Sequence, residues 1–297
     1  MVCGRHYWPY ASVTKQIAAV IIMRLVERGE LKLDYPISAY LPDWFGGLRS
    51  PTIRQLLRHQ SGLRNPERTT PDKNDVPSFY STGPTGYEWC FEGRSEPATE
   101  GYTYNNCDYI VLGELLRRVT GENYRNLLRD EILEPAGLLN NRSRISTINW
   151  YPTHWFRQGR GTLAKAGIDP ARYGMAGGLF GNLTDLVRFD RALMNGKLLG
   201  PETLAEMWRG DSRLGHMALG QWSFHATLKG CAAPVWVIER RGVIGRFQIR
   251  NFILPDREIA AVMATEIGED EFSFGELWRG EGLSYEFLSL LACETQV

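Results

Sequence analysis

The chain has 297 residues, enough for one large domain or two modest ones, each with its own hydrophobic core. Hydrophobic residues make up 43% of it and charged residues 23%, values that exclude a disordered chain, a collagen-like repeat or a coiled coil as descriptions of the whole. Lys and Arg total 34, as do Asp and Glu, so the net charge gives no electrostatic case for nucleic acid or an anionic membrane. A small-molecule partner is favoured instead.

The first half of the chain alternates helical patterns with coil. In the predicted helix at 12–30, apolar residues cover most of the circumference, as in a helix buried on nearly all sides. A short helix is predicted at 53–59. Residues 64–103 are polar and rich in Pro, Gly, Ser and Thr, and so long a coil favours the wall of a binding site over a linker. The next helical pattern, at 109–121, places the triplet at 104–106 (YNN) on a turn at a helix entrance.

The remaining chain is predicted to continue with helices and to end with strands. Further helices are expected at residues 124–133, 183–194, 201–208 and 277–293. Short β-rich runs bounded by Gly or Pro predict an antiparallel meander at 235–239, 247–254 and 259–265.

The cysteines and the apolar runs bear on the compartment. The five cysteines are odd in number, widely spaced and never arranged as Cys-x-x-Cys, so we expect buried free thiols rather than zinc sites or disulfides. The longest apolar run, residues 17–23, is far shorter than the roughly 20 residues that a membrane span needs. Residues 1–10 lack the apolar core of a secretion signal, which predicts a cytoplasmic chain as it stands, or a periplasmic one if a signal lies upstream.

Ser12 and Lys15 form a Ser-x-x-Lys pair at the start of the first predicted helix. Residues three apart share one helix face, so the Lys15 amine can reach the Ser12 hydroxyl and accept its proton. The free backbone N–H of Ser12 at a helix start could also bind the oxyanion of an acyl transfer. The pair alone is not specific, because Ser12 could be a helix N-cap and Lys15 a solvated residue.

The wider sequence gives this pair a context. Residues 11–16 (ASVTKQ) resemble the first motif of the serine β-lactamase and penicillin-binding protein superfamily, whose class C-like branch carries Tyr-x-Asn further along the chain. The triplet at 104–106 lies at the corresponding place. Other segments that agree with the family are residues 31–42, 53–63, 107–113, 176–180 and 184–186. The resemblance covers nearly the whole chain, from residue 9 to about residue 265.

The resemblance implies a β-lactamase-like α/β fold, with an antiparallel sheet flanked by helices and an inserted all-α lobe. It implies one catalytic domain over residues 1–297, with a mainly α lobe at 12–214 and an α/β lobe made of 1–11 and 215–297. Family members carry a helix and two strands before the nucleophile, whereas eleven residues precede Ser12, so N-terminal strands are expected to be missing. The sheet would then have an exposed edge, either because the chain is truncated or because another segment or subunit covers that edge, as in a homo-oligomer.

The resemblance also implies roles for four side chains. Ser12 would be the acylated nucleophile, and Lys15 would accept or relay its proton. Tyr104, as a phenolate or through its hydroxyl, would be general acid and base, with cations lowering its pKa toward a useful range. Asn106 would hydrogen-bond to Lys15 and to the substrate. Taken without the family, Tyr104 could equally be a packed aromatic residue and Asn106 a helix N-cap.

The third family motif, a Lys or His followed by any residue and a Gly, is replaced here by Arg240-Arg241-Gly242. A guanidinium binds carboxylates but does not exchange protons near neutral pH. Arg240 is therefore expected to orient an acidic end of the substrate or to provide a positive electrostatic field at Tyr104. Val243, next to Gly242, is expected to supply a second oxyanion-binding N–H. The alternatives are that both arginines face solvent or that the motif is lost.

The predicted function is a serine hydrolase that forms an acyl-enzyme with a small-molecule substrate. A small ester or amide, as in esterases and D-aminopeptidases, is favoured over a β-lactam. The five histidines show no metal-ligand spacing, and no Gly-x-Ser-x-Gly, Walker or His-Glu-x-x-His motif is present, so neither metal nor cofactor is expected. The alternative is a non-catalytic penicillin-binding-like protein that keeps the cleft for binding or regulation.

Overall fold

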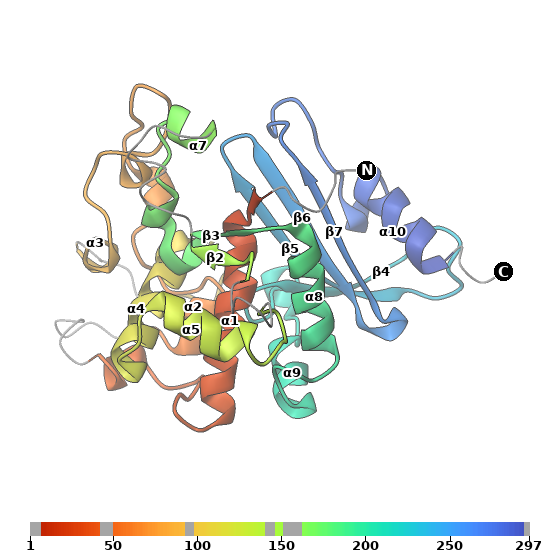
Figure 1. Cartoon of the computed structure of the whole chain (residues 1–297), viewed down its shortest axis with the longest axis horizontal. Helices are drawn as coiled ribbons and strands as arrows, with labels where there is room; N and C mark the ends of the chain where they lie inside the picture. The colour runs from red at the N-terminus through yellow and green to blue at the C-terminus, as the bar shows by residue number, and fades with distance from the viewer. Residues whose placement is uncertain (1–6, 42–49, 93–97, 140–145, 151–161, 294–297) are drawn as a thin grey trace.

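The computed structural model describes residues 7–41, 50–92, 98–139, 146–150 and 162–293. An antiparallel sheet of order β4-β5-β6-β7 lies beside a group of helices (Figure 1). Its strands are β4 (Trp222–Ala226), β5 (Val235–Ile244), β6 (Phe247–Leu254) and β7 (Ile259–Thr265). A smaller antiparallel sheet of order β1-β3-β2 joins β1 (Trp8–Pro9), β3 (Leu179–Gly181) and β2 (Asn149–Trp150).

The strands follow the predicted meander with two differences. β6 and β7 have the predicted bounds, but β5 continues to Ile244, because residues 240–244 pair with β6 up to the contact between Ile244 and Phe247. Gly242 therefore lies inside a strand rather than at a turn. Sequence reasoning missed β4, although the alternation of Trp222, Phe224 and Ala226 with polar residues is a strand pattern.

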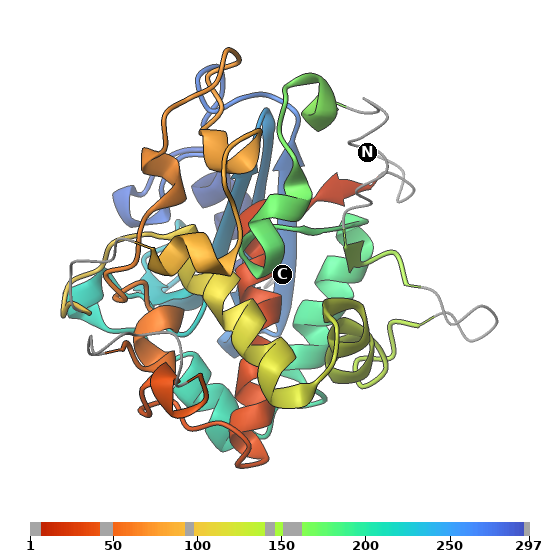
Figure 2. The ribbon, with the colours of Figure 1, turned by 90° about the vertical axis from the view of Figure 1, so that its left-hand side faces the viewer.

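The helices agree with the predicted segments, except that two short ones, at 87–91 in the predicted coil and at 162–165, were not predicted. The helices are α1 (Thr14–Glu27), α2 (Ile53–Leu57), α3 (Tyr87–Phe91), α4 (Asn106–Thr120), α5 (Tyr124–Leu128), α7 (Thr162–Lys165), α8 (Leu183–Met194), α9 (Pro201–Met207) and α10 (Leu283–Cys293). α1 is buried along most of its length, and α4 crosses it (Figure 2). The predicted helix at 277–293 is divided, because Gly280 and Gly282 adopt positive φ and α10 begins only after them. Within the described ranges, every helix is too short or too polar for a transmembrane segment.

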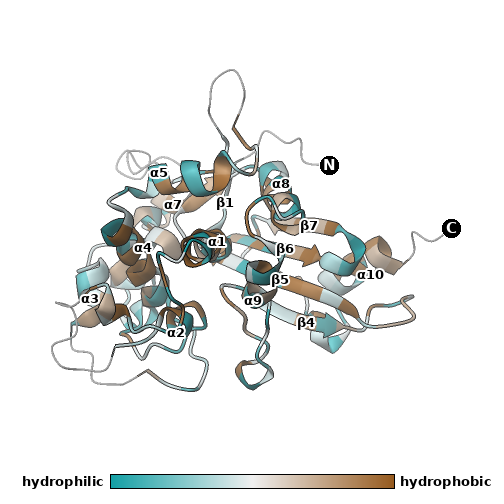
Figure 3. Cartoon of the chain, turned by 90° about the horizontal axis from the view of Figure 1, so that it is seen from below, coloured by the Kyte–Doolittle hydropathy of each residue, from teal (hydrophilic) through white to brown (hydrophobic). Residues whose placement is uncertain are grey.

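Apolar side chains cover both faces of the large sheet. Ile238, Ile249 and Ile253 join the core that contains α1, whereas Val237 and Phe252 pack with α10. Figure 3 shows this hydrophobic colouring along β5 to β7. Because successive residues of a strand face opposite sides, β5 directs the side chain of residue 240 toward α1 and that of residue 241 toward α10. The lobe boundaries at residues 11 and 214 stay a prediction.

The prediction of free thiols is wrong for four of the five cysteines. Cys90 forms a disulfide with Cys107, 17 residues away, and Cys231 forms one with Cys293, 62 residues away. The spacing of the cysteines in the sequence gave no sign of either disulfide. The first forms where α3 packs on α4, and the second forms where the connection between β4 and β5 meets the end of α10. Cys3 lies outside the described residues.

A buried carboxyl group links α8 to the sheet. Asp190 Oδ1 accepts a hydrogen bond from Asn251 Nδ2 of β6 at 2.9 Å, and the same nitrogen donates to Gln16 Oε1 of α1. Asp190 is fully buried, and its Oδ2 has no hydrogen-bond partner among the described residues. Burial raises the pKa of the Asp190 carboxyl well above its ordinary value, although the bond from Asn251 opposes this.

We expect Asp190→Asn to stabilise the protein increasingly as the pH rises from about 4 toward neutral. With a raised pKa, the folded state keeps a proton that the unfolded state releases, so the wild type loses stability across this window. The amide does not titrate and escapes this loss. Thermal unfolding of both proteins over a pH series measures the difference, and parallel curves would contradict the prediction.

Candidate active site

A cavity of about 430 Å³ opens between the start of α1, β5 and the coil at 64–103. Its wall contains most of the predicted site residues, namely Ser12, Tyr104, Asn106, Arg240, Gly242 and Val243. Lys15, the remaining one, lies behind this wall and is fully buried. The coil contributes Glu67 and Asp75, so it forms a wall of the cavity as the sequence predicts.

Ser12 lies in one 3₁₀ turn, Ala11–Val13, immediately before α1. Ala11 is in the left-handed region (φ 44°), which costs an alanine about 1 kcal/mol. The Ser12 side chain makes no capping hydrogen bond, so the N-cap alternative is wrong. Its Oγ lies 2.5 Å from Tyr104 OH and 2.9 Å from Lys15 Nζ.

The Lys15 amine is surrounded by four oxygen atoms. Its Nζ lies 2.6 Å from Asn106 Oδ1 and 2.7 Å from the carbonyl oxygen of Ala176, and both of these oxygens can only accept hydrogen bonds. The hydroxyls of Ser12 and Tyr104 lie at 2.9 and 2.7 Å. The oxygens of Asn106 and Ala176 accept two N–H groups of Lys15. The third position on the nitrogen, which holds a hydrogen or a lone pair, then points at the two hydroxyls.

The surroundings of Lys15 favour the neutral amine. Burial lowers the pKa of Lys15 well below its ordinary value, and the charge of Arg240 lowers it further, against smaller opposing effects of Glu67 and Asp108. A neutral amine in this position directs a lone pair at the Ser12 and Tyr104 hydroxyls. The alternative of a solvated lysine is therefore wrong.

Tyr104 reaches this point from the turn before α4. Its hydroxyl is enclosed among Ser12, Lys15 and Asn106, although the ring is half-buried. Burial raises the pKa of the Tyr104 phenol, and the Arg240 guanidinium, with Cζ 5.6 Å from the ring centroid, opposes this only in part. The prediction that cations lower this pKa toward a useful range is therefore wrong, and the phenol keeps its proton at neutral pH.

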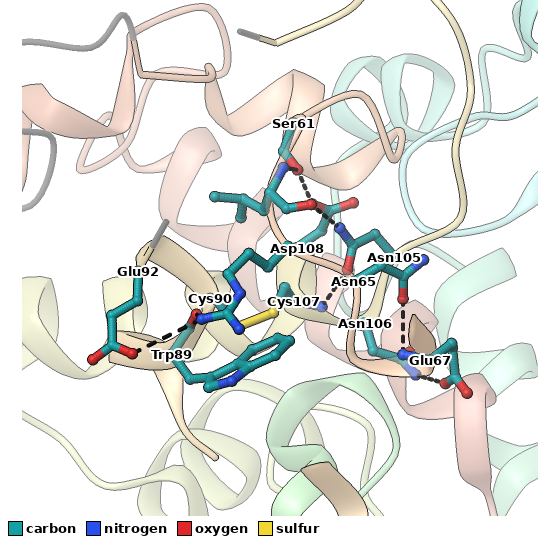
Figure 4. Close-up of a disulfide and its surroundings, with 12 residues drawn as sticks. Ser61, Asn65, Glu67, Trp89, Cys90, Glu92, Asn105, Asn106, Cys107 and Asp108 are labelled. Carbon is teal, nitrogen blue, oxygen red and sulfur yellow. Dashed lines mark hydrogen bonds and ion pairs between the residues drawn. A yellow bond between two sulfur atoms is a disulfide. The ribbon is translucent and has the colours of Figure 1, made fainter. Parts of the chain in front are cut away.

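Asn105 and Asn106 have separate tasks at the start of α4. Asn105 Oδ1 accepts from the backbone N–H of Cys107 and caps the helix, so the N-cap alternative for Asn106 is wrong. Asn106 Nδ2 donates to Glu67 Oε1 at 3.0 Å (Figure 4). The same nitrogen donates to Tyr80 OH at 2.7 Å. Because these groups take both amide hydrogens, the Asn106 oxygen is directed at Lys15.

Sequence reasoning missed the residues that orient Asn106. Glu67 Oε1 also accepts from Tyr80 OH at 2.8 Å, and the Tyr80 ring stacks on Tyr173 with centroids 3.9 Å apart. These residues lie in 3₁₀ turns, where no periodicity distinguishes them. The one available signal was the position of Glu67 in a coil already expected to form a cavity wall.

A buried polar group supports Tyr104 from behind. His59 Nδ1 lies 2.9 Å from Asp108 Oδ2, and Ser61 Oγ donates to the other oxygen of the same carboxylate. The His59 ring centroid is 4.7 Å from that of Tyr104. Burial lowers the pKa of His59 well below its ordinary value, and the charge of Arg240 adds to this, so the imidazole is neutral. The structural role predicted for His59 agrees with this position.

Arg240 lies directly behind the nucleophile. It is fully buried, and its Nε donates to the backbone carbonyl of Ser12 at 2.9 Å, so the solvent-facing alternative is wrong for this residue. Nη1 and Nη2 have no hydrogen-bond partner within the described part of the chain. Arg241 points to the opposite face of the sheet, where it pairs with Glu239 and Glu276. Arg240 therefore places a buried positive charge in the cavity wall next to Ser12.

Gly242 allows β5 to approach the nucleophile. A Cβ at this position would lie 2.5 Å from the Tyr10 carbonyl oxygen, 2.8 Å from Ile249 Cγ2 and 3.1 Å from Ser12 N. Backbone atoms account for two of these contacts, so any larger residue must displace the strand. The backbone N–H groups of Ser12 and Val243 as an oxyanion-binding pair stay a prediction.

We expect Gly242→Ala to lower kcat/KM by about 100-fold, because a small displacement of β5 moves the groups that face Ser12. Gly101→Ala is the matched control, since a Cβ there meets no atom within 4 Å. Steady-state kinetics with one chromogenic ester compare the two variants with the wild type. Equal activity of both variants would show that the close contact has no functional role.

The described residues contain no group of three or more His, Cys, Asp or Glu side chains that could hold a metal ion. The expectation that the site works without metal or cofactor stays a prediction.

Comparison with known proteins identifies the family. The family model described as Beta-lactamase matches residues 4–284. The chain belongs to the beta-lactamase family. The family predicted from the motifs at 11–16 and 104–106 is therefore confirmed.

The similar proteins in this family include a penicillin-binding protein and an esterase. The penicillin-binding protein PbpX of Bacillus subtilis (strain 168) is 26% identical over 74% of this chain and 56% of its own length. Esterase EstB of Burkholderia gladioli is 48% identical over 18% of this chain and 15% of its own length. The matches thus span about half or less of these relatives.

A solved structure confirms the predicted fold. The D-amino acid amidase of Ochrobactrum anthropi SV3, in complex with D-phenylalanine, superposes with a TM-score of 0.72. The match covers 99% of this chain and 87% of the amidase at 18% identity, so it bears on the fold alone.

Proposed function

We propose that this beta-lactamase family member is a serine hydrolase that acts on small esters or amides through an acyl-enzyme on Ser12. The observation that carries the proposal is the convergence of the Ser12, Lys15 and Tyr104 polar atoms within 2.5 to 2.9 Å of one another at the wall of one cavity. A neutral buried amine beside a serine hydroxyl is the arrangement that activates a weak nucleophile.

The proton path follows from the contacts. Ser12 Oγ attacks the carbonyl carbon while its proton passes to Tyr104, and the Tyr104 proton passes to Lys15. Lys15 then returns a proton through Tyr104 to the leaving oxygen or nitrogen, which departs and leaves an ester on Ser12. Water hydrolyses this ester along the same path. Asn106 holds Lys15 in place throughout.

The cavity supports a small ester or amide over a β-lactam. Glu67 and Asp75 bring carboxylates to the wall opposite β5, which favours a substrate with a cationic group such as an amine. Arg240 places a positive charge in the same wall, which favours a carbonyl or carboxylate oxygen of the substrate beside Ser12. The esterase among the similar proteins supports the same class.

The test compares p-nitrophenyl acetate, D-alanyl p-nitroanilide and nitrocefin with the wild type and Ser12→Ala. We expect turnover of the ester or the anilide by the wild type, none by Ser12→Ala, and an acyl adduct on Ser12 by intact-protein mass spectrometry. Turnover that survives the substitution would refute the nucleophile. Neither turnover nor an adduct with any of the three would support the non-catalytic binding protein instead.

A further inference from the structure

The cleft continues beyond the cavity that contains Ser12. A second cavity, of about 630 Å³, lies next to it, and Trp222 and Arg241 belong to the walls of both. The proposed acyl transfer uses none of the other residues in its wall. Such continuity makes the second cavity accessible to a substrate that is already bound at Ser12.

Four Trp, Tyr or Phe residues line the second cavity. Trp222 and Phe224 come from β4, Trp278 from the turn before α10, and Tyr102 from the coil ahead of α4. Phe224 and Trp278 meet edge to face with centroids 6.0 Å apart, and Trp278 is 57% exposed. Aromatic side chains gathered around one cavity are typical of a ligand-binding surface, unlike single exposed ones.

The positive charges in this wall are already neutralised. The Arg241 guanidinium lies over the Trp278 ring, with Cζ 4.5 Å from the centroid, and pairs with Glu239 and Glu276 at 2.7 Å. Arg213 likewise pairs with Asp211 at 2.9 Å. With these charges paired, the wall offers ring faces and edges rather than a net attraction for anions.

We propose that the second cavity is a subsite for a neutral aromatic group of the substrate, joined by a short linker to the ester or amide that reacts at Ser12. Trp222 marks the boundary: the carbonyl group lies on the Ser12 side, and the ring packs against the exposed Trp278 side chain. This inference rests on the proposed hydrolase function and adds a preference for aryl-bearing substrates.

The kinetic test uses two matched pairs of substrates. p-Nitrophenyl acetate and p-nitrophenyl phenylacetate vary the acyl side, and ethyl acetate and phenethyl acetate, followed by acid release, vary the leaving side. We expect Trp278→Ala to lower kcat/KM for the phenyl member of one pair by about tenfold and to leave its partner unchanged. Tyr35→Ala is the control, an exposed aromatic residue that lines neither cavity.

A binding measurement separates this inference from the proposed function. Calorimetry with the Ser12→Ala protein is expected to show a higher affinity for phenylacetamide than for acetamide. This difference in affinity is expected to be lost in the double variant that also carries Trp278→Ala. Equal effects of Trp278→Ala on both members of each pair, together with equal binding of the two amides, would overturn the subsite. Absence of turnover by the wild type with the binding difference intact would overturn the hydrolase and leave the aryl subsite in place.

Discussion

Replacing Lys15 with methionine is expected to lower kcat by about 10³- to 10⁴-fold. Methionine has a similar length and fills the buried space, but it supplies no lone pair to the Ser12 and Tyr104 hydroxyls. Without that acceptor, Ser12 is an ordinary alcohol and Tyr104 a phenol with a raised pKa. Tyr104 alone therefore cannot replace the amine at neutral pH.

Steady-state kinetics and a pH profile check this expectation together. Lys197→Met is the control, because that lysine is exposed on the surface. In the wild type, kcat/KM is expected to fall as the pH drops through the Lys15 pKa, since only the unprotonated amine accepts a proton. Burial and Arg240 lower that pKa, so the loss of activity is expected at a pH well below that at which an ordinary lysine takes up its proton. A Lys15→Met variant with the same acid limb as the wild type would exclude Lys15 as the base.

Removing the Cys90–Cys107 disulfide by double substitution to alanine is expected to destabilise the protein by about 3 kcal/mol. The bond closes a loop between residues 17 apart, and both cysteines are fully buried. Cys107 also follows Asn106 directly, at the first turn of α4 (Figure 4). We therefore expect kcat to fall several-fold as well, because the turn that holds Tyr104 and Asn106 loses its tie to α3.

The Cys231–Cys293 pair provides the matched control. Its loop of 62 residues predicts a larger loss of stability on removal, about 4 kcal/mol, but it lies at the end of α10, beside the apolar cluster that packs Val237 and Phe252 with this helix. Denaturant unfolding and kcat at a temperature where both variants are folded separate the two effects. If both pairs lower kcat equally, the Cys90–Cys107 bond has no particular influence on the site. Thiol titration of the oxidised wild type should find four of its five cysteines protected.

Local patterns in the sequence were sufficient for the parts of the fold that repeat regularly. The helix at 183–194 and the strands at 247–254 and 259–265 have the predicted bounds, because the helix has a clear apolar period after an Asn and the strands are β-rich runs on either side of a Pro. The Ser12–Lys15 contact followed from helical spacing alone. Tyr104 could be joined to that pair only through the family resemblance, since no local rule connects residues 92 apart.

The parts that failed depend on tertiary contacts. Glu67 and Tyr80 orient Asn106 across turns without periodicity, and the cysteine pairs meet only after distant helices and loops pack. The Tyr104 pKa was misjudged for the same reason. The cation was predicted correctly, but the enclosure of the hydroxyl, which outweighs it, is a property of the folded cavity.

Because the fold contains two disulfides, the redox conditions under which the protein is produced determine its properties. A chain produced in a reducing host cytosol would carry four thiols where the native fold has two covalent ties, one of them adjacent to Asn106. Such material would understate both catalytic rate and heat resistance in any screen for substrates. Assays therefore belong on protein folded under oxidising conditions, with the thiol count recorded for each batch.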